Sequence, residues 1–201
     1  MRRILIPVLL ALCAWWIYSI SRPVRYAPGI LVNGEPIQSA ITTEQSEPWA
    51  HGAYRIHALA SFDITARLLS RKFYHGDEIS DLCPIDFAVG WGPMSDQAVL
   101  DRITVWQTAR FFFWKYQNPP PISKEEIVTH ASNMHLIPST PTVAAELKTV
   151  RTGDLFRLRG LLVEATRPGS SIVRSSLIRT DTGKGACEVI WVESVERMPA
   201  R

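Results

Sequence analysis

The stretch Phe62-Asp-Ile-Thr-Ala-Arg-Leu68 decides the fold class, because apolar and polar residues alternate along it without a break. A period of two puts every second side chain on the same face, so the stretch predicts a β-strand with one face in a core. Residues 85–91 form a short apolar run that leads into a Gly-Pro turn, and residues 103–116 are rich in β-branched and aromatic side chains. We expect a strand from the first, and one long strand or two short strands from the second.

The C-terminal third predicts three more strands, at 155–165, 172–180 and 187–195. Turns at Arg167-Pro-Gly169 and Asp181-Thr-Gly-Lys-Gly185 separate them, so we expect the three strands to be consecutive and antiparallel.

Helices are expected in the middle of the chain. Ser123-x-x-Glu126 is a capping-box pattern, and residues at the spacing of one helix face follow it. These residues are Ile127, His130, Ala131 and Met134. Thr140-Pro141 supplies an N-cap and a first-turn proline for a second helix that ends near Gly153, and Ser95 can cap a short turn at 96–101. Strands grouped around two or three short helices indicate an α+β domain with a mainly antiparallel, curved sheet.

The N-terminus predicts a transmembrane helix. Residues 4–20 are apolar except for Pro7 and Ser19, and arginines flank them on both sides. A helix of this length spans about 25 Å, close to the roughly 30 Å of a hydrocarbon core. Aromatic rings favour the headgroup boundary, and the C-terminal end of the run carries Trp15, Trp16 and Tyr18.

Two other interpretations of this segment stay open. Ser19-Ile-Ser21 offers small residues for signal-peptide cleavage, and Leu10-Ala-Leu-Cys13 has the leucine and the cysteine of a lipobox, although Leu12 is large for that motif. The bulky tryptophans just upstream of the cleavage position favour a retained anchor. The positive-inside rule then predicts that the C-terminal domain lies outside the cytoplasm.

The sequence divides into three parts: the anchor at 1–21, a proline- and glycine-rich linker at 22–53, and a globular domain at 54–197. Within the linker, the apolar piece Gly29-Ile-Leu-Val32 can form a local hairpin or dock on the domain. Outside the apolar segment the cysteines are Cys83 and Cys187, which form either a disulfide in an oxidising compartment or two buried free thiols.

Composition excludes several classes of protein. With 46% hydrophobic residues and only one long apolar run, the chain is neither wholly disordered, collagen-like nor a multi-span membrane protein. The net charge is +3, and setting aside Arg2 and Arg3 leaves +1 for the rest of the chain. A nearly neutral domain lacks the basic surface that nucleic-acid binding requires.

Motifs for catalysis are weak. Asp181-Thr-Gly183 is the tripeptide that carries the catalytic aspartate in aspartic proteases, where two such aspartates act together. This chain has only one copy, and the residues beside it are polar, so we interpret the tripeptide as part of a hairpin turn. His130 and His135 would diverge on a helix, so we expect neither a metal site nor a cofactor. The chain has the residue types of a serine-hydrolase triad, namely Ser95, Ser175 or Ser176 with His135 and Asp96 or Asp181. None of these serines lies in a nucleophile-elbow sequence.

Large amphipathic side chains beside turns indicate a binding site instead. If Gln107 and Arg110 lie beside Trp91 at a sheet edge, they form a polar and aromatic pocket for a peptide, a glycan or a lipid headgroup. The binding residues that we predict are Trp91, Gln107, Arg110, Trp114 and His135. The alternative is that these rings belong to a packed core.

Three stretches resemble an uncharacterised family of bacterial single-pass membrane-anchored envelope proteins. They are Trp91-Gly-Pro-Met-Ser-Asp96, Ala131-Ser-Asn-Met-His-Leu-Ile-Pro138 and Asp181-Thr-Gly-Lys-Gly-Ala-Cys-Glu188. The resemblance implies a bacterial envelope protein with a single membrane span, and it supplies no activity. With the orientation that the positive-inside rule predicts, we expect an inner-membrane protein whose C-terminal domain lies in the periplasm. We therefore expect a non-enzymatic domain that binds an envelope protein or a ligand. The alternative is an envelope hydrolase that uses His135 with a serine or an aspartate, so the sequence leaves open whether the protein is an enzyme.

Overall fold

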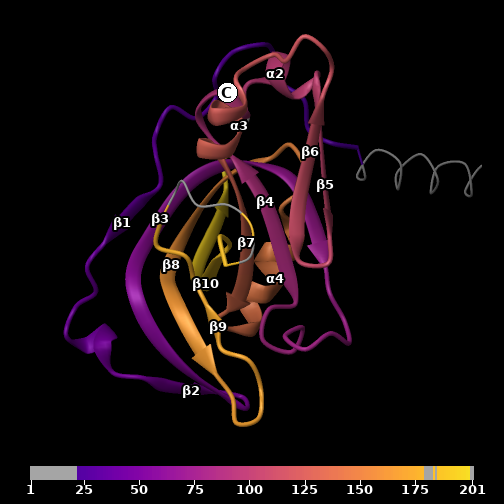
Figure 1. The fold of residues 1–201 in the computed structure, drawn as a ribbon. Helices are drawn as coiled ribbons and strands as arrows, with labels where there is room; N and C mark the ends of the chain where they lie inside the picture. Colours follow the sequence, from indigo (N-terminus) through magenta and orange to yellow (C-terminus); the bar gives the residue numbers. More distant parts are fainter. Residues whose placement is uncertain (1–21, 179–182, 184, 200–201) are drawn as a thin grey trace, which may run out of the picture.

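The computed structural model describes residues 22–178, 183 and 185–199. The fold is a mainly antiparallel β-sheet with few, short helices, as the alternating pattern at 62–68 predicts (Figure 1).

Five strands of the sheet close on themselves into a barrel. In chain order they are β3 (Tyr54–Phe73), β4 (Ile85–Gly90), β7 (Ala131–Pro138), β8 (Leu155–Thr166) and β10 (Glu188–Arg197). β4 and β8 both pair with β3, β7 lies between β4 and β10, and β10 pairs with β8. All of these pairs are antiparallel except β7 with β10.

The order of these strands identifies the fold class. Numbered one to five along the chain, the barrel strands neighbour one another as 1-2-3-5-4 and back to 1. The helix α4 (Pro141–Thr149) lies in the connection between the third and fourth strands. This five-stranded Greek-key arrangement is that of the OB-fold.

The long strand β3 makes the closure possible. Its first part pairs with β8 and its last part with β4, and its residues alternate between buried and more exposed over most of its length. The register shifts between Ala58 and Ala60, and again between Leu68 and Ser70. Such irregularities bend a strand, so that one strand can serve both neighbours.

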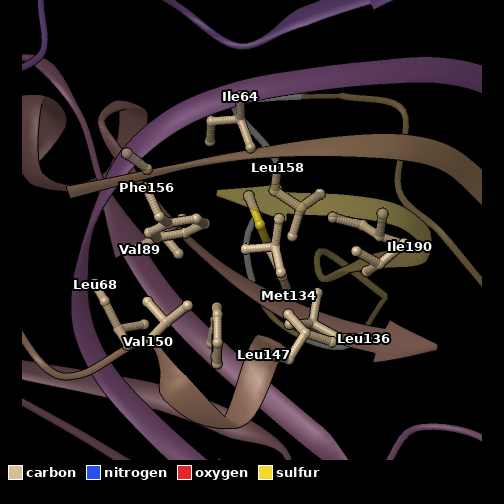
Figure 2. Close-up of a cluster of buried hydrophobic side chains, with 14 of the residues drawn as sticks. Ile64, Leu68, Val89, Met134, Leu136, Leu147, Val150, Phe156, Leu158 and Ile190 are labelled. Carbon is tan, nitrogen blue, oxygen red and sulfur yellow. The ribbon is translucent and has the colours of Figure 1, made fainter. Parts of the chain in front are cut away.

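The core fills the barrel and one of its ends. Phe87 of β4 and Phe156 of β8 pack edge to face with ring centroids 5.6 Å apart, and Met134 of β7 lies in the same cluster. Leu147 of α4, together with Val150 just after it, adds to this apolar interior (Figure 2).

A long excursion between β4 and β7 carries the remaining elements of the middle of the chain. They are η2 (Gly92–Ser95), α2 (Gln97–Leu100), β5 (Ile103–Thr108), β6 (Phe111–Tyr116) and α3 (Lys124–Thr129). The two short strands expected at 103–116 are β5 and β6, which form a separate hairpin against β3, β4 and β7. Its turn residues, Ala109 and Arg110, have φ of 48° and 70°.

The helix expected after Ser123 is shorter than its spacing predicts. The capping box of Ser123 and Glu126 is present, but α3 ends at Thr129. The prediction was therefore wrong from Ala131 onward, because 131–138 is the strand β7. Residues 131–138 lie between β4 and β10 and form backbone hydrogen bonds with both strands. This strand pairing outweighs the local preference for a helix that the residue spacing indicates.

Other boundaries also differ from expectation. The second helix is α4 with Thr140 as its N-cap, as predicted. Asp96, and not Ser95, caps α2 by accepting a hydrogen bond from the Ala98 amide. The strand expected at 172–180 is only β9 (Val173–Arg174), and 179–180 lie outside the described residues. β10 pairs with β7 and β8, so the last three strands are not simply consecutive neighbours.

Residues 22–53, where we expect a linker, lie against the barrel. Two short strands here, β1 (Ile37–Ser39) and β2 (Trp49–His51), pair with β3, with η1 (Glu44–Ser46) between them. The amides of Leu31 and Val32 both donate to the Ser95 hydroxyl at 3.0 Å. Of the two alternatives for residues 29–32, a local hairpin or docking on the domain, the structure therefore shows docking.

Within the described residues, no helix is long and apolar enough to cross a membrane. The expected anchor at 4–20 lies outside those residues.

Gly160 offers a test of the barrel closure. A Cβ at this position of β8 would lie 2.0 Å from the carbonyl oxygen of Trp191 in β10. We expect Gly160→Ala to lower the free energy of unfolding by about 1–3 kcal/mol, the usual cost of overpacking, because backbone must move to admit the methyl group.

Gly34→Ala is the matched control, since a Cβ there meets nothing within 4 Å. Urea unfolding of the two variants compares them directly. Equal stability of Gly160→Ala and the parent protein would contradict the close approach of β8 and β10.

Candidate functional site

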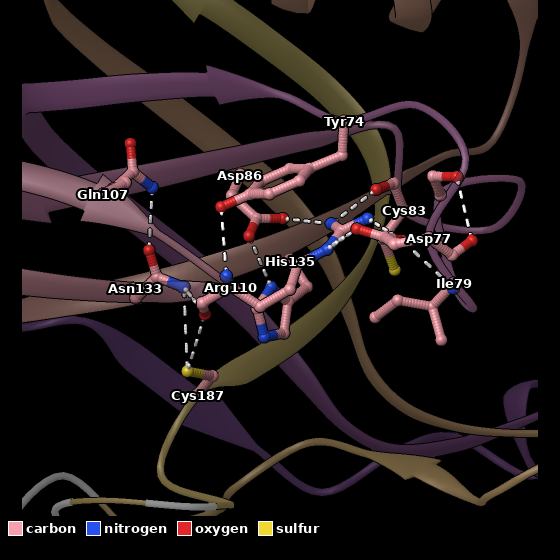
Figure 3. Close-up of polar contacts among 11 residues, drawn as sticks. Tyr74, Asp77, Ile79, Cys83, Asp86, Gln107, Arg110, Asn133, His135 and Cys187 are labelled. Carbon is pink, nitrogen blue, oxygen red and sulfur yellow. Dashed lines mark hydrogen bonds and ion pairs between the residues drawn. The ribbon is translucent and has the colours of Figure 1, made fainter.

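Polar side chains gather on the outer face of three neighbouring barrel strands. Asp86 of β4 stands opposite His135 of β7 in the register, and Asn133 lies two residues before His135 on the same face. Val189 of β10 pairs with His135, which places Cys187, two residues earlier, beside Asn133. Figure 3 shows these side chains together under the tip of the β5–β6 hairpin.

Asp86 is the centre of this network. Its side chain is 0% exposed, and a buried carboxylate is tolerated only when it is paired. One oxygen, Oδ1, accepts from Arg110 Nη1 at 2.9 Å. The other, Oδ2, faces His135 Nδ1 at 3.0 Å, and these two atoms are each other's only polar partners in the described part of the chain.

Arg110 fastens the hairpin to the barrel. Its guanidinium donates to both carboxylate oxygens of Asp77 and to the carbonyl oxygen of Cys83, besides Asp86. The same group lies 3.8 Å from the centroid of the Tyr74 ring, a cation–π contact. Arg110 holds the pKa of Asp77 below its usual range through these hydrogen bonds. The guanidinium is therefore occupied by groups of the protein itself.

His135 carries a proton at neutral pH. Burial of its side chain opposes the charged form, but hydrogen bonds with Asp86 and Cys187 outweigh it and raise the pKa of His135 to about 9. The site thus holds two cations, on Arg110 and His135, against the carboxylates of Asp86 and Asp77.

Asn133 connects the network to the hairpin and to the thiol. Its Oδ1 accepts from Gln107 Nε2 at 2.8 Å, and its Nδ2 donates to the carbonyl oxygen of Arg110 at 3.0 Å. The same Nδ2 lies 3.7 Å from the sulfur of Cys187. Gln107 and Arg110 therefore meet at Asn133.

A cavity of about 180 Å³ adjoins the network between the hairpin and the barrel. Six of its lining residues are Trp91, Phe111, Phe112, Trp114, Asn133 and Cys187. Its rings come from β6 and from the end of β4, while Ser132 and Glu188 line it and hydrogen-bond each other. The Trp91 indole N–H donates to Glu35 at 2.8 Å, so the docked N-terminal segment fixes this ring.

The predicted binding residues thus fall into two adjacent groups. Trp91 and Trp114 line the cavity, whereas Gln107, Arg110 and His135 belong to the polar network beside it. Asn133 and Cys187 take part in both.

Sequence reasoning missed Asp86 and Asn133. The available signal was a carboxylate inside the apolar run 85–91, because such a group needs a buried partner. For Cys187 the sequence indicated a disulfide or a buried free thiol, and not a place in the binding site. In the structure both Cys83 and Cys187 are free thiols, as in the second alternative, but only Cys83 is buried and Cys187 is partly exposed. Burial raises the pKa of Cys83.

The serines proposed for a hydrolase make other contacts. Ser95 Oγ donates to the Gly92 carbonyl and accepts from two amides of the docked segment. Ser175 Oγ donates to the Ser176 carbonyl and accepts from the Val189 amide. Asp181 lies outside the described residues, and within them no group of three His, Cys, Asp or Glu side chains could hold a metal ion.

No family model, curated protein or solved structure matches this chain.

Proposed function

We propose that this protein is a membrane-tethered envelope domain that binds an extended peptide segment of a partner protein, with one apolar side chain of that segment in the cavity. The observation that carries the proposal is the cavity itself, whose aromatic walls lie between the hairpin and the barrel. An apolar pocket with a few polar groups at its base is the usual form of a ligand site.

The size of the cavity limits what it can take. An apolar cavity of about 150 Å³ is known to hold benzene, so 180 Å³ accommodates one side chain of phenylalanine or leucine size. A whole drug-sized ligand needs several hundred Å³. The polar lining groups Ser132, Glu188 and Asn133 already bond to protein groups, which favours an apolar occupant over a sugar ring or a headgroup.

The hairpin offers an edge for the peptide backbone. In the described part of the chain, β5 and β6 pair only with each other. Three residues of β6, namely Phe111, Phe112 and Trp114, line the cavity. An extended peptide that adds to this edge forms main-chain hydrogen bonds with it, and the adjoining pocket binds one of its side chains selectively.

The anchor and the compartment are part of the proposal. The apolar run at 4–20, its flanking arginines and its terminal aromatic residues support an inner-membrane anchor with the domain in the periplasm. The near-neutral charge of the rest of the chain supports a protein partner over a nucleic acid.

Binding of blocked hexapeptides that differ in one central side chain tests the proposal. We expect the phenylalanine peptide to change the tryptophan fluorescence of the full chain in detergent, and a lysine peptide to bind more weakly, because the cavity is apolar. Trp114→Ala should weaken binding by about tenfold or more, the range of an aromatic anchor residue.

Trp106→Ala is the matched control, because this residue is on the same hairpin, is 41% exposed and does not line the cavity. Ala186→Phe fills the cavity from its rim and should block binding in a protein that unfolds normally. Equal loss in Trp106→Ala and Trp114→Ala, or full binding in Ala186→Phe, would contradict the proposal.

A further inference from the structure

The β5–β6 hairpin exposes aromatic rings on the face that points away from the barrel. Its other face packs against the buried cluster of Met94 and Ile127. The outer face carries Trp106, Phe111 and Phe113, which are 41%, 38% and 42% exposed, and the Trp106 and Phe113 rings stack with centroids 5.7 Å apart. We propose that this outer aromatic face lies on the lipid bilayer that holds the N-terminal anchor. This second membrane contact rests on the proposed anchor, and it goes beyond peptide binding.

The described chain begins beside this hairpin. The Val24 amide donates to the Thr152 carbonyl oxygen at 2.8 Å, and Arg25 pairs at 2.7 Å with Asp101, two residues before β5. Residues 23–25 also line one cavity together with the start of β5, and Figure 1 shows the indigo start of the described chain next to this strand. The linker that the sequence predicts at 22–53 therefore does not hold the domain away from its anchor.

The tether between the anchor and the domain is short. Val24 is four positions after Ile20, the last apolar residue of the proposed anchor, and a chain of that length spans at most about 14 Å. Trp106 is three positions after Ile103, the first residue of β5, so it lies about 10 Å along the strand. A surface that a short tether keeps near a bilayer meets it at a high effective concentration, so even a weak preference for lipid is enough for contact.

The residues of the hairpin fit the surface of an anionic membrane. Aromatic side chains favour the headgroup boundary of a bilayer. The two strands contain no acidic residue, and their one basic residue is Lys115, which pairs with Thr104 at the outer face. A lysine beside aromatic rings places its ammonium group among the headgroups while its stem covers apolar surface. The combination of exposed rings and a cation is typical of surfaces that bind anionic lipid.

The outer face is separate from the cavity. The cavity lies on the barrel side of the hairpin, and its lining does not include Trp106 or Phe113. Phe111, next to the hairpin turn, is the one ring of the outer face that also lines the cavity. Membrane contact and peptide binding can therefore be measured independently of each other.

The test uses the full chain in nanodiscs of phosphatidylethanolamine and phosphatidylglycerol. An NBD fluorophore is attached at Thr104→Cys on the outer face or, as the control, at Ser171→Cys. Both variants carry Cys13→Ser and Cys187→Ser, and Cys83 is completely buried. Ser171 follows the C-terminal end of β8, which is eleven residues or about 36 Å along the strand from the end near residue 24. We expect lipids with a spin label in the headgroup region to quench the fluorophore at 104 and not at 171.

Serine variants show whether the rings make the contact. Changing Trp106 and Phe113 to serine together should lower the quenching at position 104 to the level at 171, with an unchanged circular dichroism spectrum, because both rings are exposed. Ile172→Ser removes a 63% exposed apolar side chain beyond the far end of β8 and should leave the quenching at 104 unchanged.

The outcomes distinguish the anchor from the hairpin contact. If the chain does not enter the nanodiscs, the anchor and the hairpin contact both fail. If it enters them but the fluorophore at position 104 is quenched no more than at 171, the anchor stands and the hairpin contact is overturned. A blue-shifted fluorophore at 104 that lipid does not quench also overturns it, because protein then covers this face. Failure of hexapeptide binding in detergent would contradict the peptide site alone.

Discussion

Replacing Arg110 with methionine is expected to lower the free energy of unfolding by about 3–5 kcal/mol, the cost of leaving a buried charge without its partner. The Arg110 side chain is 14% exposed and pairs with the carboxylate of Asp86, which is 0% exposed. Its other bonds, to Asp77 and to the Cys83 carbonyl, hold the hairpin tip on the barrel. Urea unfolding followed by circular dichroism measures the loss.

Arg25→Met is the control for this experiment. Arg25 also forms an ion pair, with Asp101 at 2.7 Å, but its side chain is 66% exposed. Exposed pairs contribute about 0–1 kcal/mol, so this variant should remain close to the parent protein. If Arg110→Met lost no more stability than Arg25→Met, Arg110 would not be the anchor of the hairpin.

The second large effect concerns pH. Because the pKa of His135 is raised from 6.5 to about 9 in the folded protein, the native state holds this proton more tightly than the unfolded chain does. The resulting stability is fully present below pH 6.5 and is lost as the pH rises through 9, which amounts to about 3 kcal/mol. Urea unfolding at pH 6 and at pH 9.5 measures the difference.

Two histidine variants complete the pH experiment. His135→Gln should flatten the dependence between pH 6.5 and 9, whereas His57→Gln should preserve it, because His57 is exposed. A parent protein whose stability is constant over this range would show that His135 is not held in its charged form by Asp86 and Cys187.

Local signals in the sequence predict much of the secondary structure. The alternation at 62–68, the capping box at Ser123 and the Thr140-Pro141 cap each involve neighbours within a few residues, and each element is present. The closure of the barrel does not follow from such signals. It depends on the pairing of β3 with β8, whose partners are about 100 positions apart, for example Asp63 with Arg159.

The site is harder to predict for the same reason. Trp91 and Trp114 are recognisable as large amphipathic groups, but their cavity exists only because the β5–β6 hairpin folds over the barrel. Gln107, Arg110 and His135 are brought together by Asp86 and Asn133, two polar residues inside apolar strands. Helical spacing assigned His135 to the wrong element, so its strand neighbours were hidden.

Protection of Cys187 by the peptide tests the central claim, that the ligand occupies the cavity between the β5–β6 hairpin and the barrel. Cys187 lines this cavity, so we expect a bound side chain to shield its thiol from the reagent. The measurement is the rate of Cys187 alkylation by iodoacetamide at increasing concentrations of the phenylalanine-centred hexapeptide. The account predicts that the rate falls along the same saturation curve as the tryptophan fluorescence. An unchanged alkylation rate at a peptide concentration that saturates the fluorescence would contradict it.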